Sequence, residues 1–250
     1  MQRYFVDEMP LDGKVIVTGE NFHHIAHVMR SRVGDKHFLV FPDHTSVVGE
    51  LLELTADEAV YGHFVKEDFT RELPVALTIA CGLPKGDKLD WIVQKGTELG
   101  AAAFTAFPSQ TSVVRWDEKK RRKRLTRLEK IAKEAAEQSH RTQTPLVEFA
   151  SFAELLQGFP RFTHVLIAYE ESAKEGERAQ LVQTFEKMQP GDSLLAVFGP
   201  EGGFAPEEIA QFEAAGAKCC GLGPRILRAE TAPLYLLASA SFYFELSRGD

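Results

Sequence analysis

The chain has 250 residues, of which 44% are hydrophobic and 26% charged, so it can bury one large core or two smaller ones. This composition excludes a disordered chain. No stretch reaches the roughly 20 apolar residues of a membrane span, and the start lacks the basic-then-apolar pattern of a secretory signal. We therefore expect a cytoplasmic protein without a membrane partner. The spacing of Cys81, Cys219 and Cys220 suits neither a disulfide framework nor a zinc site, which predicts buried reduced thiols.

The net charge of −7 is unevenly distributed. Between Trp116 and Arg141 there are ten Lys or Arg against five Asp or Glu, which leaves about −12 for the remainder of the chain. The six consecutive cations at 119–124 are either a solvated helix face or a phosphate-binding surface. Both interpretations stay open at this point.

Residues 1–72 consist of short apolar runs separated by turn residues, which predicts a small β-barrel or sandwich. One segment, 21–32, has apolar residues at helical spacing behind a possible Asn21 cap, which predicts a short helix. His23 and His27 lie one turn apart on it, but no third ligand is evident. We therefore expect no metal site at these histidines.

From residue 73 onward, apolar strands alternate with amphipathic helices, which predicts an α/β domain over 73–250. Expected strands cover 75–83, 102–109, 164–170, 193–199 and 217–222. Expected helices cover 89–100, closed by Gly100, and then 117–139, 177–188, 206–216 and a last one from Thr231. Trp91 is expected to be a core residue. The last helix is apolar nearly all round, which predicts burial in a core or against a second subunit.

Two loops in the last sixty residues carry the candidate chemistry. The loop at 199–204, GPEGGF, has glycines that allow close approach to a ligand, but Glu201 and the lack of a following Lys-Ser/Thr exclude a phosphate-binding P-loop. The loop at 222–231, LGPRILRAET, combines two arginines with Glu230. Either loop alone is equally explained as a structural turn, with Arg225 and Arg228 pairing with Glu201 or Glu230. Together they predict a ligand site at the carboxyl ends of neighbouring strands.

The strings FGPEGGF and LGPRILRAETA resemble the signature pair of the RsmE branch of the SPOUT methyltransferases. The resemblance extends through HHIAHVMRSRVGD, Lys88 with WIVQKGTELG, and EQSHR, and so covers nearly the whole chain. It implies an α+β protein of two domains, a PUA-like β-barrel over 1–72 for RNA docking and an α/β SPOUT domain over 73–250. It also implies that the second domain is threaded into a trefoil knot and that the protein is a homodimer.

The same resemblance implies a methyltransferase for ribosome biogenesis, which uses S-adenosylmethionine to methylate N3 of a uridine in small-subunit (16S) ribosomal RNA. The residues implied to bind the cofactor are Gly199, Pro200, Gly202, Gly203, Leu222, Gly223, Ile226 and Leu227. Those implied to face the RNA are His24, Arg30, Arg32, Lys88, Lys95, Gln138 and Arg141.

By the same analogy, Arg228 and Glu230 lie near the reacting methyl group. Arg228 is expected to stabilise the uridine anion, while Glu230 or Glu201 accepts the N3 proton or orients other groups, and no metal is needed. Two alternatives remain open. One is a non-catalytic RNA-binding or ribosome-assembly module with the same fold, and the other is an enzyme that uses a different adenosine-containing ligand.

Overall fold

A computed structural model describes residues 1–169 and 180–247. The chain forms two compact units, Met1–Glu72 with Ala136–Gln143, and Leu73–Ala135 with Thr144–Asp250. The domain boundary expected after residue 72 does not account for residues 136–143, which return to the first unit. Within the described ranges, no helix has both the length and the apolar character needed to cross a bilayer.

The first unit is built on a curled five-stranded sheet with the order β1-β3-β4-β5-β2. Its strands are β1 (Arg3–Phe5), β2 (Val15–Val17), β3 (Lys36–Val40), β4 (Ser46–Leu54) and β5 (Ala59–Lys66). The β1–β3 pair is parallel and the other pairs are antiparallel. Two register shifts between β4 and β5 increase the local bend and twist of the sheet. The β-rich first domain expected from the sequence is confirmed.

The short helix of this unit differs from its prediction at both ends. It begins at Gly19 as α1 (Gly19–His23) and continues as a π-helical turn, η1 (His24–Val28). Asn21 is therefore not a cap, and its side-chain amide instead donates to the carbonyl of Phe5 at 2.7 Å. The helix ends before the predicted Arg32 because Arg30 adopts a positive φ of 54°, which a right-handed helix cannot contain.

The second unit contains a six-stranded parallel sheet with the order β11-β9-β10-β6-β7-β8 within the described residues. Its strands are β6 (Ala76–Gly82), β7 (Ala103–Phe107), β8 (Leu146–Phe149), β9 (His164–Ala168), β10 (Ser193–Phe198) and β11 (Lys218–Cys220). The five strands expected from the sequence are all present. β8 was not predicted, because it has only four residues and one buried side chain.

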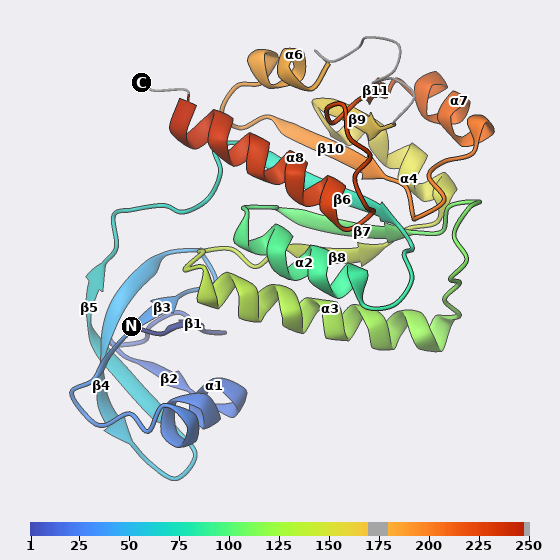
Figure 1. The fold of residues 1–250 in the computed structure, drawn as a ribbon. Helices are drawn as coiled ribbons and strands as arrows, with labels where there is room; N and C mark the ends of the chain where they lie inside the picture. The colour runs from blue at the N-terminus through green and yellow to red at the C-terminus, as the bar shows by residue number, and fades with distance from the viewer. Residues whose placement is uncertain (170–179, 248–250) are drawn as a thin grey trace. The chain divides into compact units, whose positions relative to one another are not determined.

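Helices cover both faces of this sheet, as Figure 1 shows. On one face lie α2 (Lys88–Glu98), α3 (Glu118–Gln138), α6 (Gln180–Lys187) and α8 (Thr231–Ser241), the last continued by η3 (Phe242–Ser247). On the other lie α4 (Phe152–Gly158), the turn η2 (Phe159–Arg161) and α7 (Pro206–Ala214). Successive β10 residues alternate between these two cores, so Ala196 packs on the first and Val197 on the second. The sheet is buried on both sides, as parallel sheets normally are.

Most helix boundaries in this unit agree with the sequence, and each has an identifiable cause. Pro206 begins α7, and the carboxylate of Glu208 accepts a hydrogen bond from the Ala205 N–H at 3.0 Å. Gly100 and Gly216 adopt positive φ angles of 91° and 95° just after α2 and α7. The start predicted for α6, residues 177–179, lies outside the described residues.

Four expectations about side-chain burial have different outcomes. Trp91 was expected in the core, but its side chain is 52% exposed on α2 because the buried face is formed by its neighbours Leu89, Ile92 and Val93. The apolar face of α3 is buried as predicted. The last helix is buried on one side only, since Tyr235, Phe242 and Leu246 remain 40%, 61% and 75% exposed. The three cysteines are free thiols, and Cys81 and Cys220 are buried.

Candidate functional site

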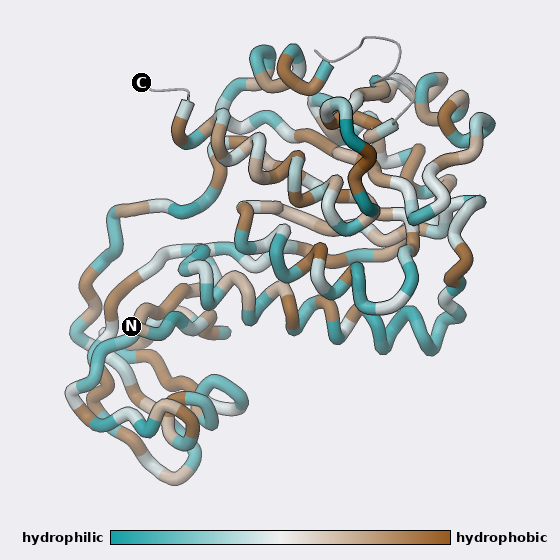
Figure 2. Tube along the Cα trace, in the orientation of Figure 1, coloured by the Kyte–Doolittle hydropathy of each residue, from teal (hydrophilic) through white to brown (hydrophobic). Residues whose placement is uncertain are grey.

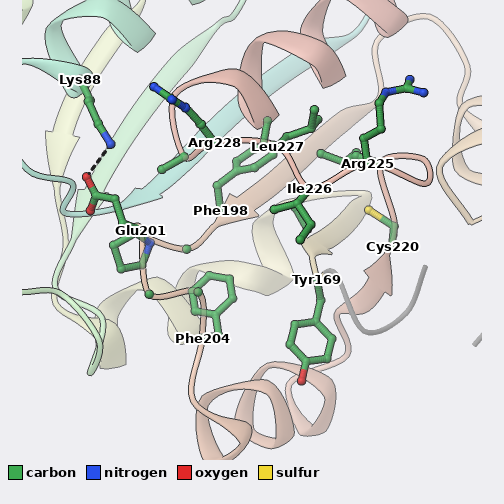
Figure 3. A pocket seen from close by; sticks show the side chains of 18 of the residues that line it. Lys88, Tyr169, Phe198, Glu201, Phe204, Cys220, Arg225, Ile226, Leu227 and Arg228 are labelled. Carbon is green, nitrogen blue, oxygen red and sulfur yellow. Dashed lines mark ion pairs between the residues drawn. The ribbon is translucent and has the colours of Figure 1, made fainter. Parts of the chain in front are cut away.

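A cavity of about 680 Å³ lies where β11, β9 and β10 end at the same edge of the sheet (Figure 3). The two loops that follow β10 and β11 form most of its wall. All eight residues expected to bind a cofactor line it, together with Arg228, Glu201 and Lys88. Its further lining residues are Ala168, Tyr169, Phe198, Phe204, Cys220, Arg225, Ala229 and Ala232. The expectation of a ligand site at strand carboxyl ends thus corresponds to a real cavity.

The glycines of the first loop have different tasks. A Cβ on Gly199 would lie 2.9 Å from the backbone of Gly203, so Gly199 is needed for the loop to fold against itself. Gly203 adopts a φ of 67°, and a Cβ there would meet nothing within 4 Å. The Gly203 N–H donates to the carbonyl of Pro200 at 2.9 Å, and the Gly203 carbonyl accepts from the Thr111 hydroxyl at 2.6 Å. Hydrogen bonds of its own N–H and carbonyl groups therefore fix the backbone of Gly203, and the space that a side chain would occupy is open.

The second loop places Arg228 at the start of α8. Its carbonyl accepts hydrogen bonds from the N–H groups of Thr231 and Ala232, at 2.9 and 3.0 Å. These bonds satisfy donors of the first helical turn and fix the backbone of Arg228. Gly223 has a positive φ of 96°, and a Cβ there would also meet nothing within 4 Å. In Figure 3 the Arg228 side chain extends toward the part of the cavity that holds Lys88 and Glu201, whereas Arg225 points away from it.

Lys88 joins the two loops through its ammonium group. Its Nζ lies 2.8 Å from Oε1 of Glu201 in the first loop and 3.3 Å from Oε2 of Glu230 in the second. The three side chains are only 32%, 31% and 20% exposed. Lys88 was expected to face RNA, but the structure places it at the edge of the cavity as a link between the two loops. Lys88 precedes Glu201 and Glu230 by more than a hundred residues, so no local sequence pattern indicates this cluster.

The charges of this cluster stabilise one another. The hydrogen bond to Glu201 raises the pKa of Lys88, and the ion pair with Glu230 adds to this effect. Burial alone would raise the pKa of Glu201, but hydrogen bonds from Lys88 and from the backbone N–H of Lys85, at 3.0 Å, outweigh it and lower that pKa. Glu201 is thus held as a carboxylate with its charge already engaged, which makes it a poor proton acceptor.

Glu230 is placed differently from Glu201. Its Oε2 is buried and accepts no hydrogen bond from the residues that the structure describes, although the Lys88 ammonium is within ion-pair distance. A buried carboxylate oxygen without a donor retains the capacity to accept one. Among the described side chains, no group of three or more His, Cys, Asp or Glu is arranged to hold a metal ion.

The other residues expected to face RNA belong to the first unit, except Lys95. In the first unit Arg30, Arg32 and Gln138 are exposed, while His24 is half-buried and shares a hydrogen bond with the Tyr4 hydroxyl at 3.0 Å. Lys95, on α2, pairs with Glu98 at 2.8 Å and lies over the ring of Trp91.

Arg141 is a correction to the expected RNA-facing set. The residue is 3% exposed, and its guanidinium is paired with Glu72. That carboxylate also accepts from the backbone of residues 142 and 143, so the pair holds the returning segment 136–143 in the first unit. Its side chain is therefore committed to a structural contact.

Several lining residues were not found by sequence reasoning. Tyr169, Phe198 and Cys220 stand at the carboxyl ends of β9, β10 and β11. All three strands were predicted, and ligands of open α/β sheets bind beyond the carboxyl ends of strands. What was missing was the strand order, which alone shows that β9 lies between the other two.

Comparison with known proteins identifies the class. The RNA methyltransferase domain family matches residues 71–241, and the RNA methyltransferase PUA domain family matches residues 17–60. The chain is 46% identical over 255 residues to ribosomal RNA small subunit methyltransferase E of Bacillus subtilis, with 100% of both chains covered. It is 31% identical to the enzyme of the same name from Mycobacterium bovis, covering 94% of this chain and 89% of that one.

A solved structure agrees with these matches. Ribosomal RNA small subunit methyltransferase E from Neisseria gonorrhoeae, bound to S-adenosyl methionine, is similar with a TM-score of 0.83 and 27% identity over 98% of both chains. The chain belongs to the family of ribosomal RNA small subunit methyltransferase E. The family resemblance drawn from the two loops is confirmed, as is the combination of a PUA domain with a methyltransferase domain.

Proposed function

We propose that this protein transfers the methyl group of S-adenosylmethionine to N3 of a uridine in small-subunit (16S) ribosomal RNA, as a step of ribosome biogenesis. The observation that carries the proposal is the cavity between the loops 199–204 and 222–230, in a chain of this family. The Neisseria gonorrhoeae relative is bound to S-adenosyl methionine, which supports the choice of cofactor.

The residues of the cavity fit such a cofactor. A volume of about 680 Å³ is in the range of about 300–1,000 Å³ that is usual for small-molecule sites. Leu222, Ile226 and Leu227 offer apolar contact for a planar base, and the open glycine positions let backbone amides approach a ligand. When bound, the cofactor supplies an electrophilic methyl group on a positively charged sulfur.

The protein's own task is to make N3 of uridine nucleophilic. The N3 proton has to leave as the methyl group is attacked, and negative charge then develops on O4 and O2 of the base. Arg228 is our candidate for stabilising this charge, because its guanidinium stays ionised and its backbone is fixed at the start of α8. Glu230 is our candidate for accepting the proton, directly or through water, because its buried Oε2 pairs with Lys88 at 3.3 Å but accepts no hydrogen bond from the described residues. Glu201 orients Lys88 instead.

RNA docking involves both units in this proposal. The exposed Arg30, Arg32 and Gln138, together with His24, Lys88 and Lys95, are the candidate RNA contacts that remain after Arg141 is removed. We also propose a cytoplasmic homodimer in which a second copy covers the exposed apolar side of α8 and η3, formed by Tyr235, Phe242 and Leu246. The trefoil knot implied by the family resemblance remains part of this proposal.

Calorimetry with S-adenosylmethionine, S-adenosylhomocysteine and ATP tests the cofactor directly. We expect the first two to bind and ATP not to. A methylation assay on small ribosomal subunits from cells that lack the gene, followed by mass spectrometry of the nucleosides, then tests the reaction. A protein that binds these subunits but transfers no methyl group is the non-catalytic assembly module. A protein that binds only ATP uses another adenosine ligand.

A further inference from the structure

We propose that the first half of α3 binds RNA phosphates next to the target nucleotide, through Lys119, Lys120, Arg122 and Lys123, the α3 basic patch. All four side chains are exposed. This inference rests on the proposed function, because it names the surface through which the same substrate is held. Figure 2 shows this half of α3 as strongly hydrophilic, in contrast to the apolar strands beside it.

The cations of this run divide into two groups by what they touch. Arg124 and Arg127 both bind the carboxylate of Asp90 on α2, at 2.8 and 2.7 Å. Arg121 lies over the ring of Phe149. These three therefore attach α3 to its own unit. By contrast, no ion pair within 4.0 Å joins a member of the α3 basic patch to a carboxylate of the described residues.

Inside the helix, Glu118 lies four residues before Arg122, a spacing that favours this one cation of the α3 basic patch. The other local effects are unfavourable. The positive end of the helix dipole lies at the N-terminus, where cations are unfavourable. Lys119 and Lys123 also repel each other at a spacing of four residues. Most of the patch thus stands where local electrostatics opposes it, on a chain whose remainder is acidic. A polyanionic partner reverses both penalties, and the phosphates of RNA are the polyanion that this enzyme has to hold.

The position of the patch fits phosphates near the reacting base. The ion pairs to Asp90 hold the first half of α3 beside the first turn of α2, and Arg124 also lies 3.7 Å from Asp87. Lys88, the next residue of α2, lies at the edge of the cavity. An RNA strand that places its uridine in the cavity therefore passes close to the α3 basic patch. The patch positions the substrate and has no part in the methyl transfer itself.

A charge-matched pair of variants tests this surface. The patch variant carries Lys119→Gln, Arg122→Gln and Lys123→Gln, and the control carries Arg161→Gln, Lys187→Gln and Lys218→Gln. All six cations are exposed in the second unit, and each variant loses three positive charges. Glutamine preserves helix propensity, so we expect the patch variant to melt no lower than the wild type. The affinity for unmethylated small ribosomal subunits is measured at several salt concentrations, with cofactor affinity alongside.

We expect the patch variant to bind the subunits at least tenfold more weakly, with the slope of log affinity against log salt reduced by about 0.7–0.9 for each lost phosphate contact. The control should keep the wild-type slope, and both should keep the wild-type affinity for S-adenosylmethionine. Equal losses in the two variants, or a wild-type slope in the patch variant, would overturn the assignment while leaving the proposed function intact. A wild-type protein that binds no S-adenosylmethionine would instead overturn the proposed function.

Discussion

Replacing Lys88 by methionine should loosen both cavity loops, because this ammonium group is their shared partner. Exposed ion pairs contribute about 0.2–1 kcal/mol each, whereas removing one partner of a fully buried pair costs about 3–5 kcal/mol. The Lys88 pairs are at 2.8 and 3.3 Å, with side chains 20–32% exposed, so they lie between these limits but nearer the first. We expect Lys88→Met to lower the free energy of unfolding by about 1–2 kcal/mol. If binding of the cofactor has to supply this 1–2 kcal/mol to order the loops, the affinity for the cofactor falls roughly 5- to 30-fold.

A double-mutant cycle measures the link itself. Urea unfolding and cofactor calorimetry are performed on Lys88→Met, Glu201→Gln and the double variant, and we expect a coupling free energy of about 0.5–1.5 kcal/mol. Lys85→Met is the matched control, since its side chain is exposed and only its backbone N–H binds Glu201. If the coupling is zero, or if Lys85→Met is as damaging as Lys88→Met, the reasoning about the loop link is wrong.

Three further predictions concern other parts of the molecule. Gly203→Val should abolish cofactor binding in calorimetry, because the new side chain enters open space at the cavity wall. The φ of 67° strains any side chain at this position, so we also expect a lower melting temperature, and calorimetry is performed below it; an unchanged isotherm would contradict the site. Arg228→Ala should bind cofactor and RNA nearly normally but lose about a hundred- to a thousand-fold in single-turnover rate, with partial rescue at high pH; a wild-type rate would contradict its role. Burial alone would raise the pKa of Glu67, but hydrogen bonds from Arg71, Ser46 and Arg3 lower it to about 2. This stabilisation, on the order of 2 kcal/mol, is complete above about pH 4.5 and lost as the pH falls toward 2, so Glu67→Gln should flatten acid unfolding curves in that window.

The sequence by itself determined most elements of the second unit, although not β8 or α4, and the location of its ligand loops. Strands such as 193–198 are continuous apolar runs, and Pro206, Gly100 and Gly216 end or begin helices through local backbone geometry that needs no distant partner. The glycine and arginine loops were recognisable because their residue types are unusual for structural turns. The family resemblance followed from those same local strings.

Only the tertiary structure decided how distant residues are combined. The family resemblance implied RNA contacts for both Lys88 and Arg141. In the structure Lys88 pairs with both cavity loops, and Arg141 is buried against Glu72. Trp91 has the spacing of a core residue but lies on the exposed side of α2. The helix at 19–28 ends early because Arg30 leaves the helical region, and no composition signal marks this. For Lys88 and Arg141, the partner lies tens to more than a hundred residues away in the sequence. For Arg30, the surrounding fold sets the backbone angle. Periodicity and propensity report only on neighbours in sequence, so they do not contain this information.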